Sequence, residues 1–197
     1  YFARTIAEFM DEKGVEKASL AGNSMGGGIA ARFALDYPGR TDRLILIDSA
    51  GVKHGGSHFL FKLIATPGIN NFLSSMNNQY VVGRLLKRTS FYDDSKVTTE
   101  KAAAYMKPFR TKGAMRAAAA TMVNNKWDSL EPELPSLDAP TLIIWGDKDM
   151  LIYPAIAHKF HNLIPGSQLE VIEKCGHIPQ EEKPEETARI MLRFLAE

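Results

Sequence analysis

Short apolar runs alternate with helical patterns along this chain, and this alternation constrains the fold more than any other feature. The runs have the length of buried strands and lie at residues 18–21, 44–47 and 141–145, and the segment Gln168-Leu169-Glu170-Val171-Ile172 repeats this rhythm as a fourth strand. Apolar residues recur at helical spacing between or beside them, at 2–10, 29–37, 155–163 and 188–195. Alternating strands and helices predict an α/β fold with a parallel sheet, and in such sheets chemistry gathers at the carboxyl ends of the strands.

A long segment, residues 51–127, separates the second predicted strand from the third. It is rich in helix formers and far longer than an ordinary crossover connection. We therefore predict a helical cap, or lid, at 51–127. The flanking residues, 1–50 and 128–197, would form the two segments of one core domain.

The sequence Gly22-Asn23-Ser24-Met25-Gly26 lies directly between a predicted strand and a predicted helix. A serine hydroxyl is a weak nucleophile, so it must be held clear of the sheet and near a base, as a strained strand-to-helix turn does. The helix directs free backbone amides toward this serine, and the amide of Met25 is the natural oxyanion donor. The alternatives are a glycine-rich turn that only permits close packing and a phosphate loop, whose lysine is missing. We predict that Ser24 is a nucleophile.

A serine nucleophile needs a general base, and the chain has five histidines. His177 follows the fourth predicted strand, so it should lie at the carboxyl edge of the sheet. The others are less well placed: His54, His58, His158 and His161. The last two are three residues apart on a predicted helix, but without a third ligand we expect surface residues rather than a metal site.

Three aspartates could supply the carboxylate that fixes the histidine tautomer. Asp147 and Asp149 follow the third predicted strand, in a loop that should neighbour that of His177. Asp48 ends the second predicted strand and could also reach the histidine. Spacing alone does not choose among the three.

Three motifs together make the chain resemble the cap-bearing branch of the alpha/beta-hydrolase fold superfamily. They are Gly22-Asn23-Ser24-Met25-Gly26-Gly27, Trp145-Gly146-Asp147-Lys148-Asp149 and Gly176-His177-Ile178-Pro179-Gln180-Glu181. The resemblance covers nearly the whole chain and reproduces the family order of nucleophile, acid and histidine. It implies that Asp149 is the acid, with Asp147 a solvated or loop-capping neighbour and Asp48 a minor alternative. It also implies the C-terminal half of the hydrolase sheet, about four parallel strands with flanking helices, plus a helical cap.

The resemblance further implies segments that this sequence does not contain. Family members begin with about four further strands and a His-Gly loop whose amide supplies a second oxyanion donor. The chain opens at Tyr1, and its first residues already have a helical pattern. We therefore expect an N-terminally incomplete sequence whose chemistry needs residues outside it.

The resemblance implies a serine hydrolase that cleaves a carboxylic ester or related acyl bond through an acyl-enzyme. Ser24 would attack the carbonyl while His177 takes its proton, the Met25 amide would bind the oxyanion, and Asp149 would orient His177. Apolar side chains in the predicted cap suggest a small-molecule substrate with an apolar portion. These residues could also merely pack the cap onto the core, so none is assigned as a substrate contact: Phe59, Phe61, Leu63, Ile64, Leu85 and Leu86.

Two other functions are compatible with the sequence. The nucleophile motif also resembles that of carbon–carbon bond hydrolases, which cleave vinylogous diketones from aromatic degradation. Those enzymes commonly carry a tryptophan after the catalytic histidine and an arginine in the lid helix, where this chain has Ile178 and Tyr105. The third function is that of a hydrolase-like interaction protein without activity, and the intact set of Ser24, Asp149 and His177 argues against it.

Composition excludes several classes of protein. Lys and Arg number 24 against 23 for Asp and Glu, which argues against a nucleic acid or an acidic membrane as partner. Cys175 is the only cysteine, so an internal disulfide or a multi-cysteine metal site cannot form. No apolar run approaches the roughly 20 residues that span a bilayer. We expect a cytoplasmic enzyme that needs no metal or organic cofactor, and we make no prediction of its oligomeric state.

Overall fold

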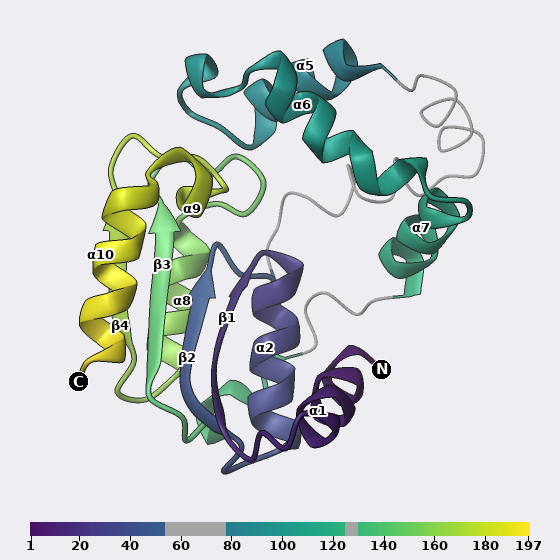
Figure 1. The fold of residues 1–197 in the computed structure, drawn as a ribbon. Coiled ribbons are helices and arrows are strands. Elements are labelled where there is room, and N and C mark those ends of the chain that lie inside the picture. Colours follow the sequence, from purple (N-terminus) through teal and green to yellow (C-terminus); the bar gives the residue numbers. More distant parts are fainter. Residues whose placement is uncertain (54–77, 125–129) are drawn as a thin grey trace.

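The structure is a computed structural model that describes residues 1–53, 78–124 and 130–197 (Figure 1). Four parallel strands form one sheet in the order β1-β2-β3-β4. Each strand contains one of the predicted strand segments: β1 (Ala18–Asn23), β2 (Thr41–Ile47), β3 (Thr141–Gly146) and β4 (Gln168–Ile172). The predicted α/β class with a parallel sheet is therefore confirmed.

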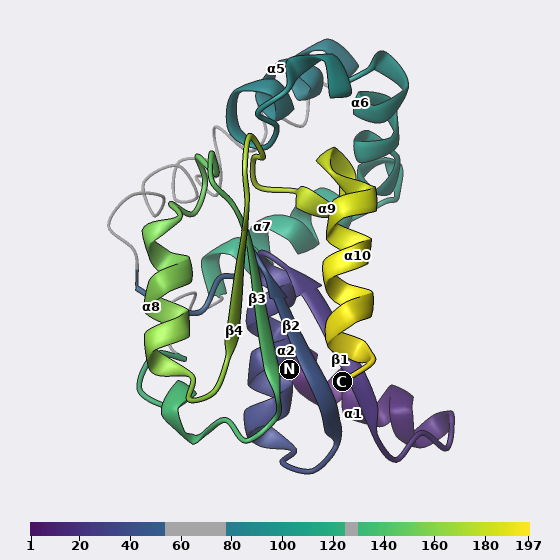
Figure 2. The same cartoon turned by 90° about the vertical axis from the view of Figure 1, so that its left-hand side faces the viewer.

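Helices cover both faces of this sheet (Figures 1 and 2). In β2, Leu44 and Leu46 pack in one buried cluster with residues of two of these helices, whereas Ile45 and Ile47 pack with residues of a third on the opposite face. This alternation explains why residues 44–47 of the strand are apolar without interruption, since successive side chains enter two different cores. The helices of the first face are α2 (Met25–Asp36) and α8 (Ala155–Leu163), the helix of the second face is α10 (Pro184–Leu195), and α1 (Phe2–Glu12) packs beside α2.

The described part of the predicted cap is helical and lies over the carboxyl ends of the strands (Figures 1 and 2). It comprises α5 (Gln79–Thr89), η1 (Asp94–Lys96), α6 (Thr99–Met106), η2 (Lys107–Arg110) and α7 (Ala114–Asn124). A further short turn, η3 (Leu134–Ser136), leads the chain back into the core. The predicted limits of the cap, at residues 51 and 127, stay a prediction because 54–77 and 125–129 lie outside the described residues.

The strand register aligns the ends of all four strands at this covered edge. Asn23 pairs with Ile47, Ile47 pairs with Ile144, and Gly146 pairs with Ile172. The loops that follow β1, β2, β3 and β4 therefore start close together, and each carries a candidate site residue. Within the described part of the chain, no helix is long and apolar enough to cross a membrane.

Candidate active site

Ser24 lies at a sharp turn between β1 and α2 and has an unusual backbone conformation. Its φ is 54° and its ψ is −118°, a region that costs a residue with a side chain of the order of 1–3 kcal/mol. Backbone hydrogen bonds hold it there: the Ser24 amide donates to Ile47 O at 2.9 Å, and Ser24 O accepts from Gly27 at 3.1 Å and Ala50 at 2.9 Å. The turn is thus the strained strand-to-helix elbow that the motif predicts.

The two glycines that flank this elbow in the motif are not equivalent. A Cβ at Gly22 would lie 2.3 Å from the backbone carbon and oxygen of Gly26, whereas a Cβ at Gly26 would meet nothing within 4 Å among the described residues. A Cβ at Gly27 would lie 2.4 Å from Ser49 Oγ. Of the two glycines that flank Ser24 in the motif, Gly22 is therefore required by close backbone contact and Gly26 is not, while Gly27 is required next to it.

Gly22→Ala is expected to destabilise the fold strongly, by about 3 kcal/mol or more, because backbone must move to admit the methyl group. Gly26→Ala is the matched control. It lies in α2, where alanine is favoured over glycine by up to about 1 kcal/mol, so this variant should be neutral or slightly stabilised. Urea unfolding followed by circular dichroism measures both. Equal midpoints for the two variants would contradict the steric argument.

His177 and Asp149 form a buried hydrogen-bonded pair. His177 Nδ1 lies 2.7 Å from Asp149 Oδ2, and the two residues are 5% and 1% exposed. Asp149 Oδ1 accepts from the amides of Leu151 at 2.7 Å and Ile152 at 3.0 Å. The carboxylate is therefore fully engaged, and it holds the imidazole in the tautomer that has its proton on Nδ1 and leaves Nε2 free to accept one.

Close backbone contact between two loops brings this pair together. A Cβ at Gly146 would lie 2.0 Å from the carbonyl oxygen of Gly176, so the loop after β3 packs directly on the loop that carries His177. Asp147, in the same loop, accepts from the Cys175 amide at 3.2 Å and pairs with Lys148 at 2.7 Å. Asp147 thus has the loop-capping position that the resemblance implies for it.

The elbow and the histidine loop are joined through the residue before Ser24. Asn23 Nδ2 donates to His177 O at 3.0 Å and to Ile47 O at 3.2 Å. Within the described part of the chain, the Ser24 hydroxyl makes no hydrogen bond to the His177 imidazole, and the Met25 amide donates to no acceptor. Such contacts commonly tighten only when substrate is bound. The structure therefore joins the Ser24 elbow to the His177 loop, and the catalytic roles of Ser24, His177, Asp149 and Met25 stay a prediction.

Asp48 is the third acidic group at this edge and is completely buried. Its Oδ1 accepts from the Gly146 amide at 3.1 Å, its Oδ2 has no partner, and its φ is 42°. Asp48, Asp149 and His177 each offer one atom within 4.8 Å of the others, as a cation site would. Both Asp149 oxygens, however, already accept hydrogen bonds, so the cluster is organised as an acid–histidine pair with a second carboxyl group beside it. Burial, reinforced by the Asp149 charge, raises the pKa of Asp48 well above its usual value.

The raised pKa of Asp48 predicts how the stability of the folded protein depends on pH. The folded state holds the Asp48 proton more tightly than the unfolded chain, so the group's contribution to stability is complete below its unfolded pKa of about 3.9 and falls as the pH rises. The variant Asp48→Asn has no ionisable group at this position, so it does not lose stability in this way as the pH rises. Its carboxamide oxygen can still accept the hydrogen bond from the Gly146 amide. The melting temperature of the variant, relative to the unmodified protein, should therefore increase from pH 4 to pH 8. A difference that stays constant over this range would contradict the assignment.

The remaining sequence candidates lie away from this cluster or outside the described residues. His158 and His161 are exposed on α8, as predicted, and His161 Nδ1 contacts Ser167 Oγ at 3.0 Å. Leu86 packs with Phe91, Val97 and Ile178, which favours a packing role, whereas Leu85 is 48% exposed. The other predicted residues fall among the undescribed ones: His54, His58, Phe59, Phe61, Leu63 and Ile64.

Two residues that the sequence did not single out contribute to the site. One is Asn23, whose side chain joins the elbow to the histidine loop. The other is Glu182, a completely buried carboxylate close to the His177 loop in α9 (Pro179–Glu182). Asn23 is part of the motif that carries the nucleophile, so its position was visible. Glu182 lies between two charged neighbours in Glu181-Glu182-Lys183, and nothing in the sequence distinguishes it from a surface residue.

Comparison with known proteins places this geometry in a family. The family model described as alpha/beta hydrolase fold matches residues 1–184. A curated relative, the 2-hydroxy-6-oxononadienedioate/2-hydroxy-6-oxononatrienedioate hydrolase of Comamonas testosteroni, is 33% identical over 98% of this chain and 68% of its own length. The solved meta-cleavage product hydrolase from Pseudomonas fluorescens IP01 has a TM-score of 0.79 at 28% identity, covering 97% of this chain and 69% of that one.

A second kind of solved structure is also similar. A membrane phospholipase A has a TM-score of 0.72 at 32% identity, over 98% of this chain and 61% of that one. The fold, the motif order and the family match agree with one another. The chain belongs to the alpha/beta-hydrolase fold family.

Proposed function

We propose that this chain carries the catalytic residues of a hydrolase that cleaves a carbon–carbon bond in a vinylogous diketone, a small substrate with an apolar portion. The observation that carries the hydrolytic chemistry is the buried Asp149–His177 pair, 2.7 Å long, on a loop hydrogen-bonded to the strained elbow of Ser24. The choice of bond is supported by relatives named as hydrolases of 2-hydroxy-6-oxo-dienoates. These relatives favour the carbon–carbon alternative over the ester cleavage that the sequence alone ranked first.

The proposed reaction uses one water molecule and no redox partner. The Ser24 hydroxyl attacks the ketone carbon as His177 Nε2 takes its proton, and the Met25 amide donates to the oxyanion. In the diketo tautomer of the substrate the carbon–carbon bond then breaks, its electron pair passes through the conjugated enone onto the carbonyl oxygen, and the resulting enolate takes the proton from His177. Water, activated by the same imidazole, releases the acyl group from Ser24 as a carboxylic acid.

Ester hydrolysis is the second candidate, and the cap favours it. By the resemblance, Tyr105 lies near the position where the carbon–carbon hydrolases commonly carry an arginine, and its hydroxyl donates to Glu181 Oε1 at 2.6 Å. Burial, together with Glu181, raises the pKa of Tyr105, so the phenol stays a neutral donor and offers no charge to an anionic substrate. Ile178 follows His177 and is buried in the cap contact. The 32% identity to a phospholipase A agrees with this candidate.

One comparison of substrates separates the two candidates. Full-length protein is assayed with 2-hydroxy-6-oxo-6-phenylhexa-2,4-dienoate, by loss of the dienoate absorbance, and with nitrophenyl esters of short and medium chain length. The proposal expects kcat/KM for the dienoate to exceed that for the best ester. A higher value for an ester would overturn the choice of bond but leave serine hydrolysis intact. Turnover of neither substrate would favour the interaction protein without activity.

A further inference from the structure

We infer that Glu182 is a positioning residue for His177: its buried carboxylate fastens the histidine loop to the cap segment between α5 and η1. The inference rests on the proposed role of His177 as general base. It concerns how this base is held, and it adds a fourth side chain to the three that the motifs identify.

The contacts of Glu182 join two segments that are far apart in sequence. Oε1 accepts from the amides of Tyr92 at 2.9 Å and Asp93 at 2.6 Å, at the start of η1. Oε2 accepts from the Gly176 amide at 2.7 Å, directly before His177. The side chain is 1% exposed, so one desolvated carboxylate serves three backbone donors. Hydrogen bonds to a charged acceptor are roughly twice as strong as neutral ones.

The same two segments also touch each other directly. The His177 amide donates to Ser90 O at 2.8 Å, and a Cβ at Gly176 would lie 2.5 Å from that oxygen. With Asn23 donating to His177 O, the backbone of His177 is held on both sides. Glu182 completes this frame, because it fixes the peptide group immediately before the histidine. A small rotation of that peptide would change the position of the imidazole relative to Ser24.

The neighbouring glutamate has a different task. Glu181 accepts from Tyr105 at 2.6 Å and pairs with Lys101 at 3.2 Å, so it binds side chains of α6. Lys101 also lies 4.9 Å from the centre of the Phe91 ring. Glu181 therefore holds the cap helix, whereas Glu182 holds the backbone of the histidine loop. The two adjacent glutamates provide a matched pair of variants.

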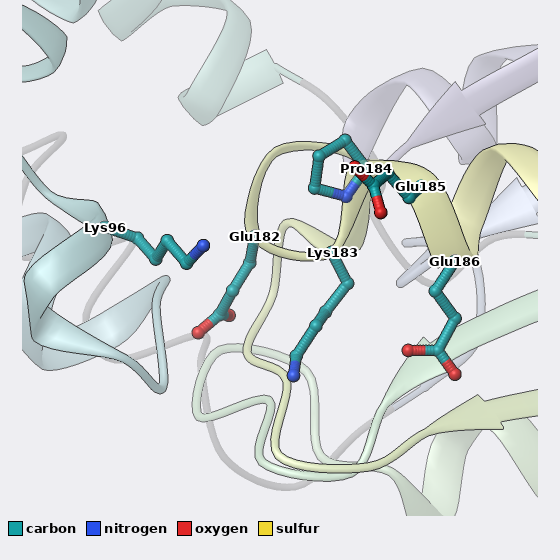
Figure 3. A pocket seen from close by; sticks show the side chains of 6 residues that line it. All are labelled: Lys96, Glu182, Lys183, Pro184, Glu185 and Glu186. Carbon is teal, nitrogen blue, oxygen red and sulfur yellow. The ribbon is translucent and has the colours of Figure 1, made fainter.

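Glu182 acts on His177 without lining the reaction site. It borders a pocket of about 310 Å³ together with charged side chains from the cap and from α10, and Lys96 extends toward it (Figure 3). Ser24, Asp149 and His177 do not line this pocket. A group on its wall is therefore placed to act on the reaction through the histidine loop, as a positioning residue does.

The experiment compares Glu182→Gln with Glu181→Gln in the full-length protein. A glutamine has only one acceptor oxygen, and its amide group would face a backbone donor, so the Gly176 or the Tyr92 side must be released. The first readout is the rate at which a fluorophosphonate labels Ser24, measured against pH. We expect Glu182→Gln to slow labelling about 10- to 100-fold, the range seen when hydrogen-bond partners that orient a metal-ligating histidine are removed, and to displace the pH midpoint of labelling. Glu181→Gln should label within a few-fold of the unmodified protein.

A stability control separates positioning from simple loss of fold. Leu134→Ala removes a completely buried side chain of η3, in the cluster that α2 and α8 form on the opposite face of the sheet from α10, and should lower the melting temperature without slowing labelling. Glu182→Asp keeps the negative charge on a shorter side chain and serves as the second variant if Glu182→Gln does not fold. Its rate of labelling should lie between that of the unmodified protein and the loss of about 10- to 100-fold expected for Glu182→Gln. Labelling of Glu182→Gln at the unmodified rate and pH midpoint would overturn the inference.

A second readout does not depend on the chemistry. Amide hydrogen exchange over residues 175–178 should be slow in the unmodified protein and faster in Glu182→Gln, with no change in Glu181→Gln. Unchanged exchange in Glu182→Gln would overturn the inference even if the protein proves to have no activity. If the fluorophosphonate does not label the unmodified protein, the nucleophilic role of Ser24 is contradicted. That result would overturn the proposed function rather than the inference about Glu182.

Discussion

Replacing Ser24 by alanine in the full-length protein is expected to lower kcat by about 10⁶-fold, the loss seen when a serine nucleophile of this type is removed. The residue offers the only oxygen at the elbow that can become bonded to the substrate carbon in the proposed reaction. Because its hydroxyl makes no hydrogen bond within the described residues, the substitution should leave the melting temperature nearly unchanged. Steady-state turnover and thermal unfolding of the same preparation measure both effects.

The control for this prediction is His158→Ala on the exposed surface of α8, which should retain activity within a few-fold. A contaminating hydrolase would give equal turnover in the Ser24→Ala preparation and in the unmodified one. A Ser24→Ala variant that keeps a tenth or more of the activity, after such contamination is excluded, would contradict a nucleophilic serine. The binding function without catalysis would then become the better explanation.

The parts of the molecule that the sequence predicts well depend on short-range patterns. The runs of the two central strands, β2 and β3, are apolar without interruption because their side chains enter cores on both faces. The edge strands β1 and β4 are only partly buried and carry polar residues. The elbow at Ser24 follows from a motif whose glycine at 22 is sterically required. Asp149 and His177 follow strands that end at the same edge, so their meeting depends only on strand order.

The parts that the sequence does not predict depend on close contacts between distant loops. Asp48 and Asp149 have the same side chain at neighbouring strand ends, and spacing leaves both as candidates. What distinguishes them is backbone geometry: Asp149 accepts two amides of its own loop and faces Nδ1 of His177. The burial of Glu182 is harder still to predict from the sequence. Three backbone amides from two remote segments donate to its carboxylate and so compensate the loss of water.

The second large effect is expected for Asp149→Asn, with a loss in kcat of about 10⁴-fold and little change in KM. The two amides of Leu151 and Ile152 require an acceptor, so the oxygen of the new carboxamide must take the place of Oδ1. Its NH₂ group then faces His177 Nδ1, which must become an acceptor. The imidazole proton moves to Nε2, the nitrogen that should receive the proton of Ser24, and the base is blocked in the wrong tautomer.

Asp48→Asn is the matched control for this argument. It replaces a second buried carboxyl group by the same carboxamide, within 4.8 Å of the same imidazole, but leaves the Asp149 contact in place. We expect its turnover to stay within about tenfold of the unmodified protein, because Asp48 makes no hydrogen bond to His177 in the described structure. If Asp48→Asn instead lost activity as severely as Asp149→Asn, the two carboxyl groups would act as one unit. If Asp149→Asn remained active while Asp48→Asn did not, Asp48 would be the acid that orients His177. Among the described residues, no other buried carboxylate offers an atom to this imidazole.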